Sequence, residues 1–493
     1  MQTKARIHLL SVKLLLGLFV VLIELIFINS LASAGFEFVI SSAAVTVALL
    51  MQLRFAVRPT AGSPADMVVF IFNWLFLDLA PKIQLMNMPQ RLINTSTVAV
   101  DRVALTNLIC ALFMVAFTLF YGFFSKRVEG ASAAAGAPAA AGADAAGAKA
   151  GGASANASPP EFTAGAVGFA ALVCMGVVAL AAPSAYAAVE NSVAASPASL
   201  MVQRCLLFLP SATLLILLHE TVRSGRKLMF SRVCVLLLLL VLVFITENPY
   251  TEKRNALGPV YIALLLVAFQ KWFSSWTRRF VLLISGMVLV FPAIAIFTHN
   301  HQQTVGDVSL TQIADQIADH YFSINYDSWA NIYTAIEIVK VHGAQWGHQL
   351  LGSLLFFVPS ALWTTKPFAT GIFLADYLIK NYSMWFTNLS APLVAEGYLD
   401  FGPIGVVAFA AVAAIVVTLL NKMALRSSRW AGFPMATYTG VFLMIVMRGS
   451  LMIALAFASA AWLAFWAASA MLSMKLGVRH RAARRLNMRA ATL

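Results

Sequence analysis

The sequence predicts an all-α polytopic membrane protein with about twelve transmembrane helices and one large helical loop outside the membrane. Two observations predict this class. Of the 493 residues, 60% are hydrophobic and only 11% are charged, whereas soluble domains carry about 25% charged residues. Apolar runs that approach the roughly 20 residues needed to cross a bilayer recur along the chain. A water-soluble fold could not hide so much apolar surface, so the bilayer must cover part of it.

The apolar runs form three groups of predicted transmembrane helices, within residues 1–128, 161–298 and 402–476. The individual spans are expected at residues 9–29, 36–53, 67–80, 103–124, 162–182, 200–219, 229–246, 258–273, 280–298, 402–420, 433–447 and 451–476. The third and eleventh spans are short for a bilayer and therefore have the weakest support.

A segment of unusual composition, residues 129–160, separates the first two groups. It consists almost entirely of Ala, Gly, Ser and Pro. Such a segment has almost no large side chain to bury, so it cannot offset the entropy lost on ordering. We therefore predict a disordered linker without a catalytic role, on the cytoplasmic side of the membrane.

The net charge of +14 would suit a nucleic-acid partner, but the distribution of the charge argues against one. Lys and Arg gather in short runs at the ends of the apolar segments and in the tail 477–493. This is the pattern of the positive-inside rule, which holds cytoplasmic loops positive. Each span carries the chain to the other side of the membrane, so the predicted spans place both termini in the cytoplasm and residues 299–401 in a periplasmic loop. Nucleic acid is not expected as a partner.

Several charged residues do not fit this simple alternation. Lys82, Arg91 and Arg102 fall on the predicted outer side, so either the third span is misplaced or these cations have a purpose. Glu24 and Asp78 lie inside predicted spans. Charged groups at membrane depth are costly and suggest a function. Both lie toward the outer half of their spans, so a side chain that reaches up to water is an equal alternative.

The loop 299–401 is expected to contain amphipathic helices rather than a span. In residues 326–341, the polar side chains Asp327, Asn331 and Thr334 share one helical face. Residues 350–363 are apolar but too short to span comfortably, and Pro359 interrupts them. A re-entrant or interfacial segment fits better. Trp and Tyr are frequent in the loop, which suits either the membrane–water boundary or stacking on sugar rings.

Four short elements follow one another from residue 248 to residue 449. They consist of Asn248 and Pro249 with Arg254, then Pro359, Trp363, Lys366 and Pro367, then Pro392, Glu396, Tyr398, Phe401, Gly402 and Gly405, and finally Arg448 and Gly449. In this order and placement, the elements resemble those of the O-antigen polymerase family (Wzy type), the oligosaccharide repeat-unit polymerases among the GT-C-like membrane glycosyltransferases. Ser360 stands where the family pattern would have Arg, so one phosphate contact is missing.

The resemblance implies a glycosyltransferase in the bacterial inner membrane that builds surface polysaccharide, such as the O-antigen of lipopolysaccharide. It would transfer a growing glycan from undecaprenyl pyrophosphate to a sugar hydroxyl of another lipid-linked unit. The lipid-linked oligosaccharide and the bilayer are its implied partners, with a flippase and a chain-length regulator as further candidates. No metal or cofactor is expected, because no His, Cys or carboxylate pair has the spacing of a metal site near these elements.

The departing pyrophosphate needs fixed cations, for which arginine is well suited. The predicted outer cations are Arg254, Arg448 and Lys366. The acceptor hydroxyl needs a base or an orienting acceptor, and the candidates for this role are His342, His348, Glu396, Glu337 and Asp327. We choose His342 as base and Glu396 as a structural or acceptor-binding group. Trp363, Tyr398 and Asp327 complete the predicted substrate-binding set together with Lys366.

Other readings stay open from the residues alone. A ligase-like transferase would share this architecture and differ in its acceptor, which would be a lipid A core or a protein. A transporter or flippase of lipid-linked oligosaccharide would need polar residues in its central spans, and these spans are nearly uniformly apolar. A purely structural scaffold would leave the outer arginines without a purpose.

Overall fold

The protein is an all-helical bundle in the part of the chain that the structure describes. A computed structural model describes residues 2–30, 35–57, 62–88, 90–136, 162–190, 197–225, 229–249, 254–290, 319–426 and 430–474. The regular structure of these residues is helical throughout. Most of the linker predicted at 129–160 and the tail 477–493 lie outside them.

The helices follow in four groups along the chain. The first group holds α1 (Gln2–Ser30), α2 (Phe36–Ala56), α3 (Ala65–Trp74), the π-helical turn η2 (Leu75–Leu79), α4 (Ala80–Asn87) and α5 (Val100–Gly136). The second holds α6 (Ala164–Glu190), α7 (Pro197–Ser224), α8 (Phe230–Thr246), α9 (Arg254–Ala268), the 3₁₀ turn η4 (Trp272–Ser274), α10 (Trp276–Ser285) and the π-helical turn η5 (Gly286–Val290). The third holds the 3₁₀ turn η7 (Ile324–Tyr326), α13 (Ser328–His342), α14 (His348–Leu354) and α15 (Thr370–Tyr382). The fourth holds α16 (Leu393–Arg426), α17 (Gly432–Arg448) and α18 (Leu451–Ser473).

Eight helices in the described part are long and apolar enough to cross a bilayer. They cover Leu10–Ser30, Phe36–Ala56, Ala65–Asn87, Val100–Lys126, Ala164–Ala181, Met201–Ser224, Leu393–Leu425 and Leu451–Ser473. Two shorter apolar helices are Phe230–Thr246 and Leu257–Ala268. The chain is therefore a polytopic helical membrane protein. The number of about twelve spans stays a prediction, and the end of the ninth predicted span lies outside the described residues.

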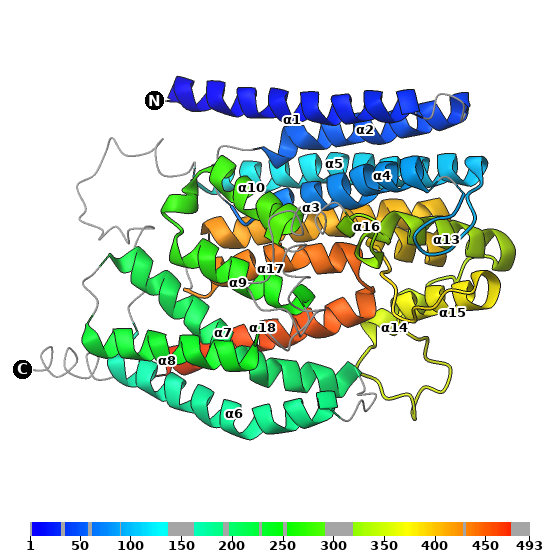
Figure 1. Ribbon diagram of the computed structural model, residues 1–493. Helices are drawn as coiled ribbons and strands as arrows, with labels where there is room; N and C mark the ends of the chain where they lie inside the picture. Colours follow the sequence, from blue (N-terminus) through cyan, green and yellow to red (C-terminus); the bar gives the residue numbers. More distant parts are fainter. Residues whose placement is uncertain are drawn as a thin grey trace, which may run out of the picture.

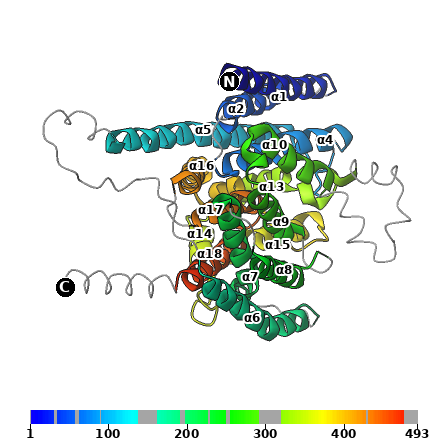
Figure 2. The same cartoon turned by 90° about the vertical axis from the view of Figure 1, so that its left-hand side faces the viewer.

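The long helices run side by side, and the helices of the loop gather at one end of the bundle. Figure 1 shows α13, α14 and α15 together at the right-hand end, where α17 ends and α18 begins. The start of α1 and the end of α18 lie at the opposite end, which faces the viewer in Figure 2. This arrangement agrees with the alternation of sides that the charges predict.

The third membrane helix is longer than residues 67–80, the span expected from the sequence. It runs from Ala65 to Asn87 as α3, η2 and α4 stacked end to end. The sequence-based limit was wrong because Lys82 was taken as a loop residue. In the structure Lys82 is buried, and ion pairs with Glu24 and Asp78 compensate its charge. Glu24 is buried as well, so its carboxylate does not reach up to water.

Two other limits differ from the prediction. α16 begins at Leu393 rather than at residue 402, and it kinks at Phe401 and Gly402, where the φ of Gly402 is 60°. That positive φ favours glycine. The segment 350–363 is not one re-entrant helix, because α14 ends at Leu354. Turns and extended chain follow, with Leu362 81% and Phe368 70% exposed.

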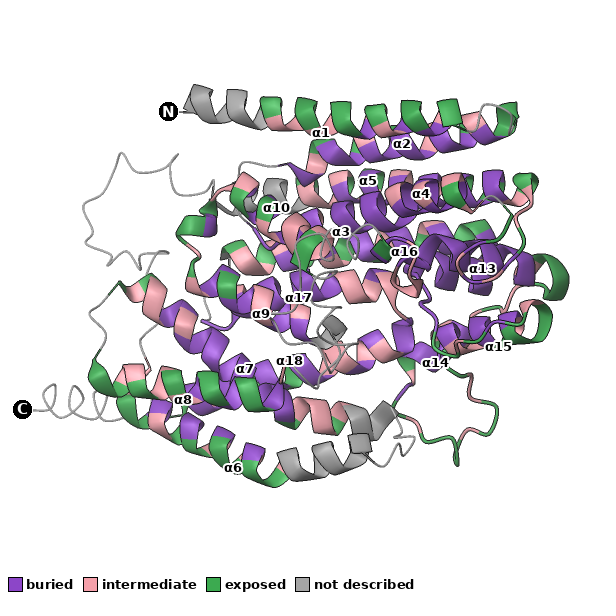
Figure 3. Ribbon diagram, viewed as in Figure 1, coloured by how far each residue is buried: buried purple, intermediate pink, exposed green. Residues whose placement is uncertain are grey.

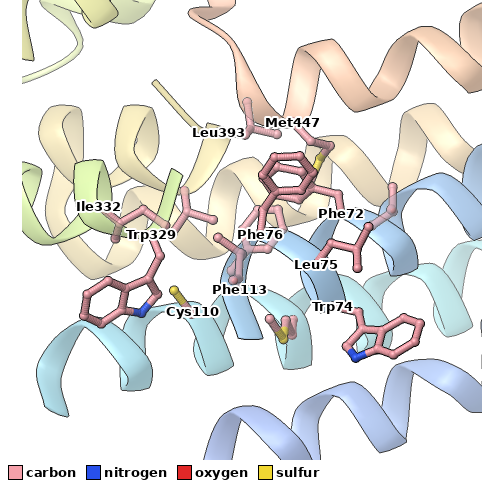
Figure 4. Packing of buried hydrophobic residues seen from close by; sticks show 14 of the residues in the cluster. Phe72, Trp74, Leu75, Phe76, Cys110, Phe113, Trp329, Ile332, Leu393 and Met447 are labelled. Carbon is pink, nitrogen blue, oxygen red and sulfur yellow. The ribbon is translucent and has the colours of Figure 1, made fainter. Parts of the chain in front are cut away.

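The third membrane helix also forms the centre of the main core. In its most apolar stretch 89% of the residues are buried, against 17% for α1 at the edge. Figure 3 shows α1 with a largely exposed outer face. Phe72 and Phe76 project from it toward Met447 of α17 and Phe113 of α5 (Figure 4). This central position brings η2 into contact with α13.

Candidate functional site at the α17–α18 elbow

The chain turns sharply between α17 and α18, at Arg448, Gly449 and Ser450. α17 ends at Arg448, Gly449 and Ser450 are extended, and α18 starts at Leu451. The backbone N–H of Gly449 donates to the carbonyl of Ile445 at 2.6 Å, and a Cβ on Gly449 would come within 3.0 Å of the same oxygen. We call residues 448–451 the elbow. The side chain and backbone groups of the elbow form hydrogen bonds with η7, α15 and α16.

Arg448 points from the elbow toward the start of α13. Its Nε donates to the carbonyl of Asn325 at 3.0 Å, and its Nη2 lies 3.4 Å from the carbonyl oxygen of Ile324. The same Nη2 lies 3.4 Å from Oδ1 of Asp327. Nη1 has no hydrogen-bond partner among the described residues. A guanidinium offers five donors, so Arg448 is held in place and keeps donors for an anion.

Asp327 is the carboxylate that faces Arg448, and it is 1% exposed. Its Oδ2 accepts hydrogen bonds from the backbone N–H of Ser390 at 3.0 Å and from Asn331 at 2.9 Å. Its Oδ1 accepts from the hydroxyl of Ser390 at 2.5 Å. These hydrogen bonds fix the position of the carboxylate beside Arg448. Asp327 therefore suits the positioning of Arg448 better than the transfer of protons.

Arg448 borders a cavity of about 110 Å³. The cavity is lined by α9, α17, the two π-helical turns and η7, and its lining residues are Phe76, Gly258, Pro259, Ile262, Met287, Asn325, Tyr326, Val441, Met444, Ile445, Arg448 and Gly449. Among the described residues of this lining, Arg448 is the one that carries a charge. π-helical turns often occur at functional sites. A mostly apolar cavity with a guanidinium at its edge suits a ligand with an apolar part and an anionic group.

Glu396 lies on the other side of the elbow and is fully buried. Its Oε1 accepts the backbone N–H of Leu451 at 2.8 Å, and its Oε2 accepts the hydroxyl of Thr370 at 2.7 Å. The carboxyl thus caps the start of α18 and ties it to α15. α15 has a second contact with the elbow, because the backbone N–H of Gly371 donates to the hydroxyl of Ser450 at 2.8 Å. Of the two roles expected for Glu396, this geometry supports the structural one.

His342, the base chosen from the sequence, is not near Arg448. It is exposed at the last residue of α13, whereas Asp327 precedes the first. Fifteen helical residues separate them, which corresponds to roughly 22 Å. The structure therefore does not bring His342 together with the guanidinium. The choice of His342 rested on the chemistry of imidazole, which contains no information about position.

Lys366 and Trp363 lie in the loop between α14 and α15. The Nζ of Lys366 donates to the carbonyls of Phe356 and Val358 at 2.7 and 2.8 Å, so the side chain holds the loop closed. Burial lowers the pKa of Lys366. Trp363 donates from Nε1 to the hydroxyl of Thr365 at 3.0 Å. Both residues have partners within their own loop.

Two further predicted residues belong to helices that adjoin the elbow. Tyr398 is mostly buried in α16. α9 begins at Arg254, whose side chain lies outside the described part of the structure. Gly258, about one turn later, lines the cavity. The described part of the structure thus joins Arg448 directly to Asp327, places Glu396 behind the elbow, and leaves the contacts of Arg254 a prediction.

The sequence interpretation missed a second ion pair, between Arg102 of α5 and Glu337 of α13. Nη1 of Arg102 lies 2.5 Å from Oε2 of Glu337. Oε1 of Glu337 accepts the hydroxyls of Tyr377 at 3.1 Å and Tyr382 at 2.5 Å. Burial and the charge of Glu337 raise the pKa of Tyr377 to about 12. The signal was present in the sequence, because Arg102 was one of the cations out of place under the positive-inside rule.

Comparison with known proteins adds no relative to this description. No protein-family model, no curated protein and no solved structure matches the chain. The fold and the membrane helices define its class, which is that of polytopic helical membrane proteins.

Proposed function

We propose that the protein is a membrane glycosyltransferase of the repeat-unit polymerase type. It would take a glycan from a polyprenyl diphosphate and join it to a sugar hydroxyl of a second lipid-linked unit. In this reaction the bond between the anomeric carbon and the diphosphate oxygen breaks, and a bond from that carbon to the acceptor oxygen forms. The hydroxyl proton passes to water, and the diphosphate leaves with the electron pair.

The observation that carries the proposal is the position of Arg448. It borders a mostly apolar cavity at the end of the bundle where the loop helices gather. A donor with an isoprenoid chain and a diphosphate presents an apolar part next to an anion. A fixed guanidinium aimed at the leaving group stabilises the charge that develops there without reorganising. Asp327 and the carbonyls of Ile324 and Asn325 would fix its direction.

The experiment replaces Arg448 by Ala and by Lys in cells that lack their own copy of the gene. A gel of surface glycan is the readout. We expect Arg448→Ala to leave single repeat units, with normal amounts of the protein in the membrane, and Arg448→Lys to restore a small fraction of the ladder because Lys is not bidentate. Arg278→Ala is the matched control, since Arg278 contacts the carbonyl of Trp272 on the exposed surface.

The outcome separates the neighbouring functions. A normal ladder from Arg448→Ala would end the proposal. Finished polymer that stays on its lipid would instead indicate a ligase.

A transporter of lipid-linked oligosaccharide is the second candidate. The buried charges Glu24, Asp78 and Lys82 favour it, because transporters hold polar groups within their membrane helices. Loss of lipid-linked units from the outer leaflet in the null strain would identify this function.

A further inference from the structure

Three charged side chains form a cluster inside the membrane-spanning part, away from Arg448. Glu24 comes from α1, Asp78 from η2 and Lys82 from α4, and they are 5%, 1% and 4% exposed. The Nζ of Lys82 lies 2.6 Å from Oε2 of Glu24 and 3.2 Å from the hydroxyl of Thr46, and it also donates to Oδ1 of Asp78. The three acceptors match the three donors of an ammonium, so each donor of Lys82 has a partner.

The charges of this cluster do not balance if both carboxyls are ionised. Two carboxylates against one ammonium leave one net negative charge in the bundle interior, and such a charge is expensive there. In the described part of the structure, the other polar or ionisable side chains that face the cluster are Ser42 and Thr46 of α2 and Asn107 and Cys110 of α5. The first three carry no charge, and a thiol is ordinarily neutral at pH 7. One additional positive charge would neutralise the cluster.

The hydrogen bonds indicate which of the two carboxylates would bind a proton that supplies this charge. Oε2 of Glu24 accepts from Lys82 and from the hydroxyls of Ser42 and Thr46, both at 3.0 Å. Asp78 accepts only from Lys82 among the described residues. Donors stabilise the ionised form, so Glu24 is the better anion. Oδ2 of Asp78 has no partner among the described residues, and the same holds for Oε1 of Glu24.

A small cavity adjoins Asp78. Its volume is about 10 Å³, and Ser42, Asp78, Lys82 and Asn107 contribute its polar lining. That volume corresponds to about one water molecule. Nine residues, or about 14 Å of helix, separate Asp78 from the end of α4 at Asn87. A water in this cavity would accept a hydrogen bond from the O–H of a carboxylic acid at Asp78.

We propose that Asp78 is a proton-binding site inside the membrane-spanning part, protonated at pH 7 while Glu24 and Lys82 are ionised. The step adds one proton to Oδ2 of the carboxylate and gives a neutral carboxylic acid. Lys82 already occupies the space between the carboxylates, and the cavity has room for one water only, which favours a proton over a hydrated metal cation. The proposal does not depend on the glycosyltransferase function.

Infrared spectroscopy of the full chain in lipid nanodiscs at pH 7 tests this. The difference between the wild type and Asp78→Asn should contain the carbonyl band of one protonated carboxyl. Aspartate labelled with carbon-13 in its side chain should shift the band, and labelled glutamate should not. Lys82→Met should add a second protonated carboxyl, because no cation then remains. Three results would each overturn the proposal: absence of the carbonyl band, a shift of this band with labelled glutamate, or loss of the band when the buffer contains sodium instead of potassium.

Thermal unfolding provides the second measurement, which does not depend on the band. Asn is a neutral isostere of a protonated aspartic acid, so Asp78→Asn should leave the unfolding temperature unchanged. Glu24→Gln should lower it, because Gln removes the anion that Lys82, Ser42 and Thr46 hold in place. A large loss of stability in Asp78→Asn together with none in Glu24→Gln would reverse the assignment.

Discussion

Arg448 at the end of α17 and Asp327 at the start of α13 form an ion pair, with 3.4 Å between Nη2 and Oδ1. The backbone carbonyls of Ile324 and Asn325 bind the same guanidinium. The pair therefore joins α17 to α13 at the edge of the cavity.

Asp327→Asn should impair both stability and transfer. The substitution leaves Arg448 without its carboxylate and weakens the bonds from Ser390, at a cost of about 2 kcal/mol for charge-assisted hydrogen bonds. We expect the unfolding temperature to fall and glycan transfer to fall by more than tenfold. Asp376→Asn is the control, because Asp376 is exposed on α15. Unchanged transfer in Asp327→Asn would show that Arg448 does not need this partner.

Gly371→Ala should disrupt the junction behind the elbow. A Cβ at this position would lie 2.1 Å from the backbone oxygen of Leu389 and 2.8 Å from the hydroxyl of Ser450. Backbone atoms would have to move, which typically costs about 1–3 kcal/mol. Gly168→Ala in α6 is the matched control, because its Cβ would meet nothing within 4 Å. We expect Gly168→Ala to raise the unfolding temperature slightly and Gly371→Ala to lower it.

His342→Ala should leave transfer nearly unchanged. The imidazole lies roughly 22 Å along α13 from Asp327, too far for direct contact with a group bound at Arg448. Initial rates with a lipid-linked donor would measure this. A loss of about a hundredfold or more, the scale of general base catalysis, would restore His342 as a candidate base.

Alkaline pH should destabilise the cluster around Glu337. The pKa of Tyr377 is raised to about 12 in the folded protein, against about 10 in an unfolded chain. The folded state therefore holds the phenol proton more tightly, and this stabilisation is complete below pH 10 and is lost as the pH rises toward 12. Thermal unfolding from pH 9 to 12 should show a smaller decline for Tyr377→Phe than for the wild type. Equal declines would mean that Tyr377 does not contribute.

Features that depend on local composition could be predicted from the sequence. The apolar runs identify most of the membrane helices. Arg448 was singled out because it forms a short element with Gly449 and is a cation on the predicted outer side. These inferences need only neighbouring residues and the positive-inside rule.

Partners that are distant in sequence could not be predicted in the same way. Lys82 meets Glu24, 58 residues earlier, and the sequence does not show that α1 lies against α4. The polar face of α13 is buried because Asn94 donates to Asn331 and Thr334, 237 and 240 residues later. Hydrophobic periodicity indicates that such a face exists but does not name what covers it.

The π-helical turn η2 has a consequence for the motion of the third membrane helix. A π-turn holds one residue more than an α-turn, which offsets the following side chains by about 100°. Phe76 within the turn stacks on Tyr326 with ring centroids 4.8 Å apart, while Asp78, two residues on, meets Lys82. If the extra residue moved along the helix past both Phe76 and Asp78, these two side chains would turn by about 100° without unwinding of α3 or α4. The stacking of Phe76 on Tyr326 and the ion pair of Asp78 with Lys82 would then break in one event.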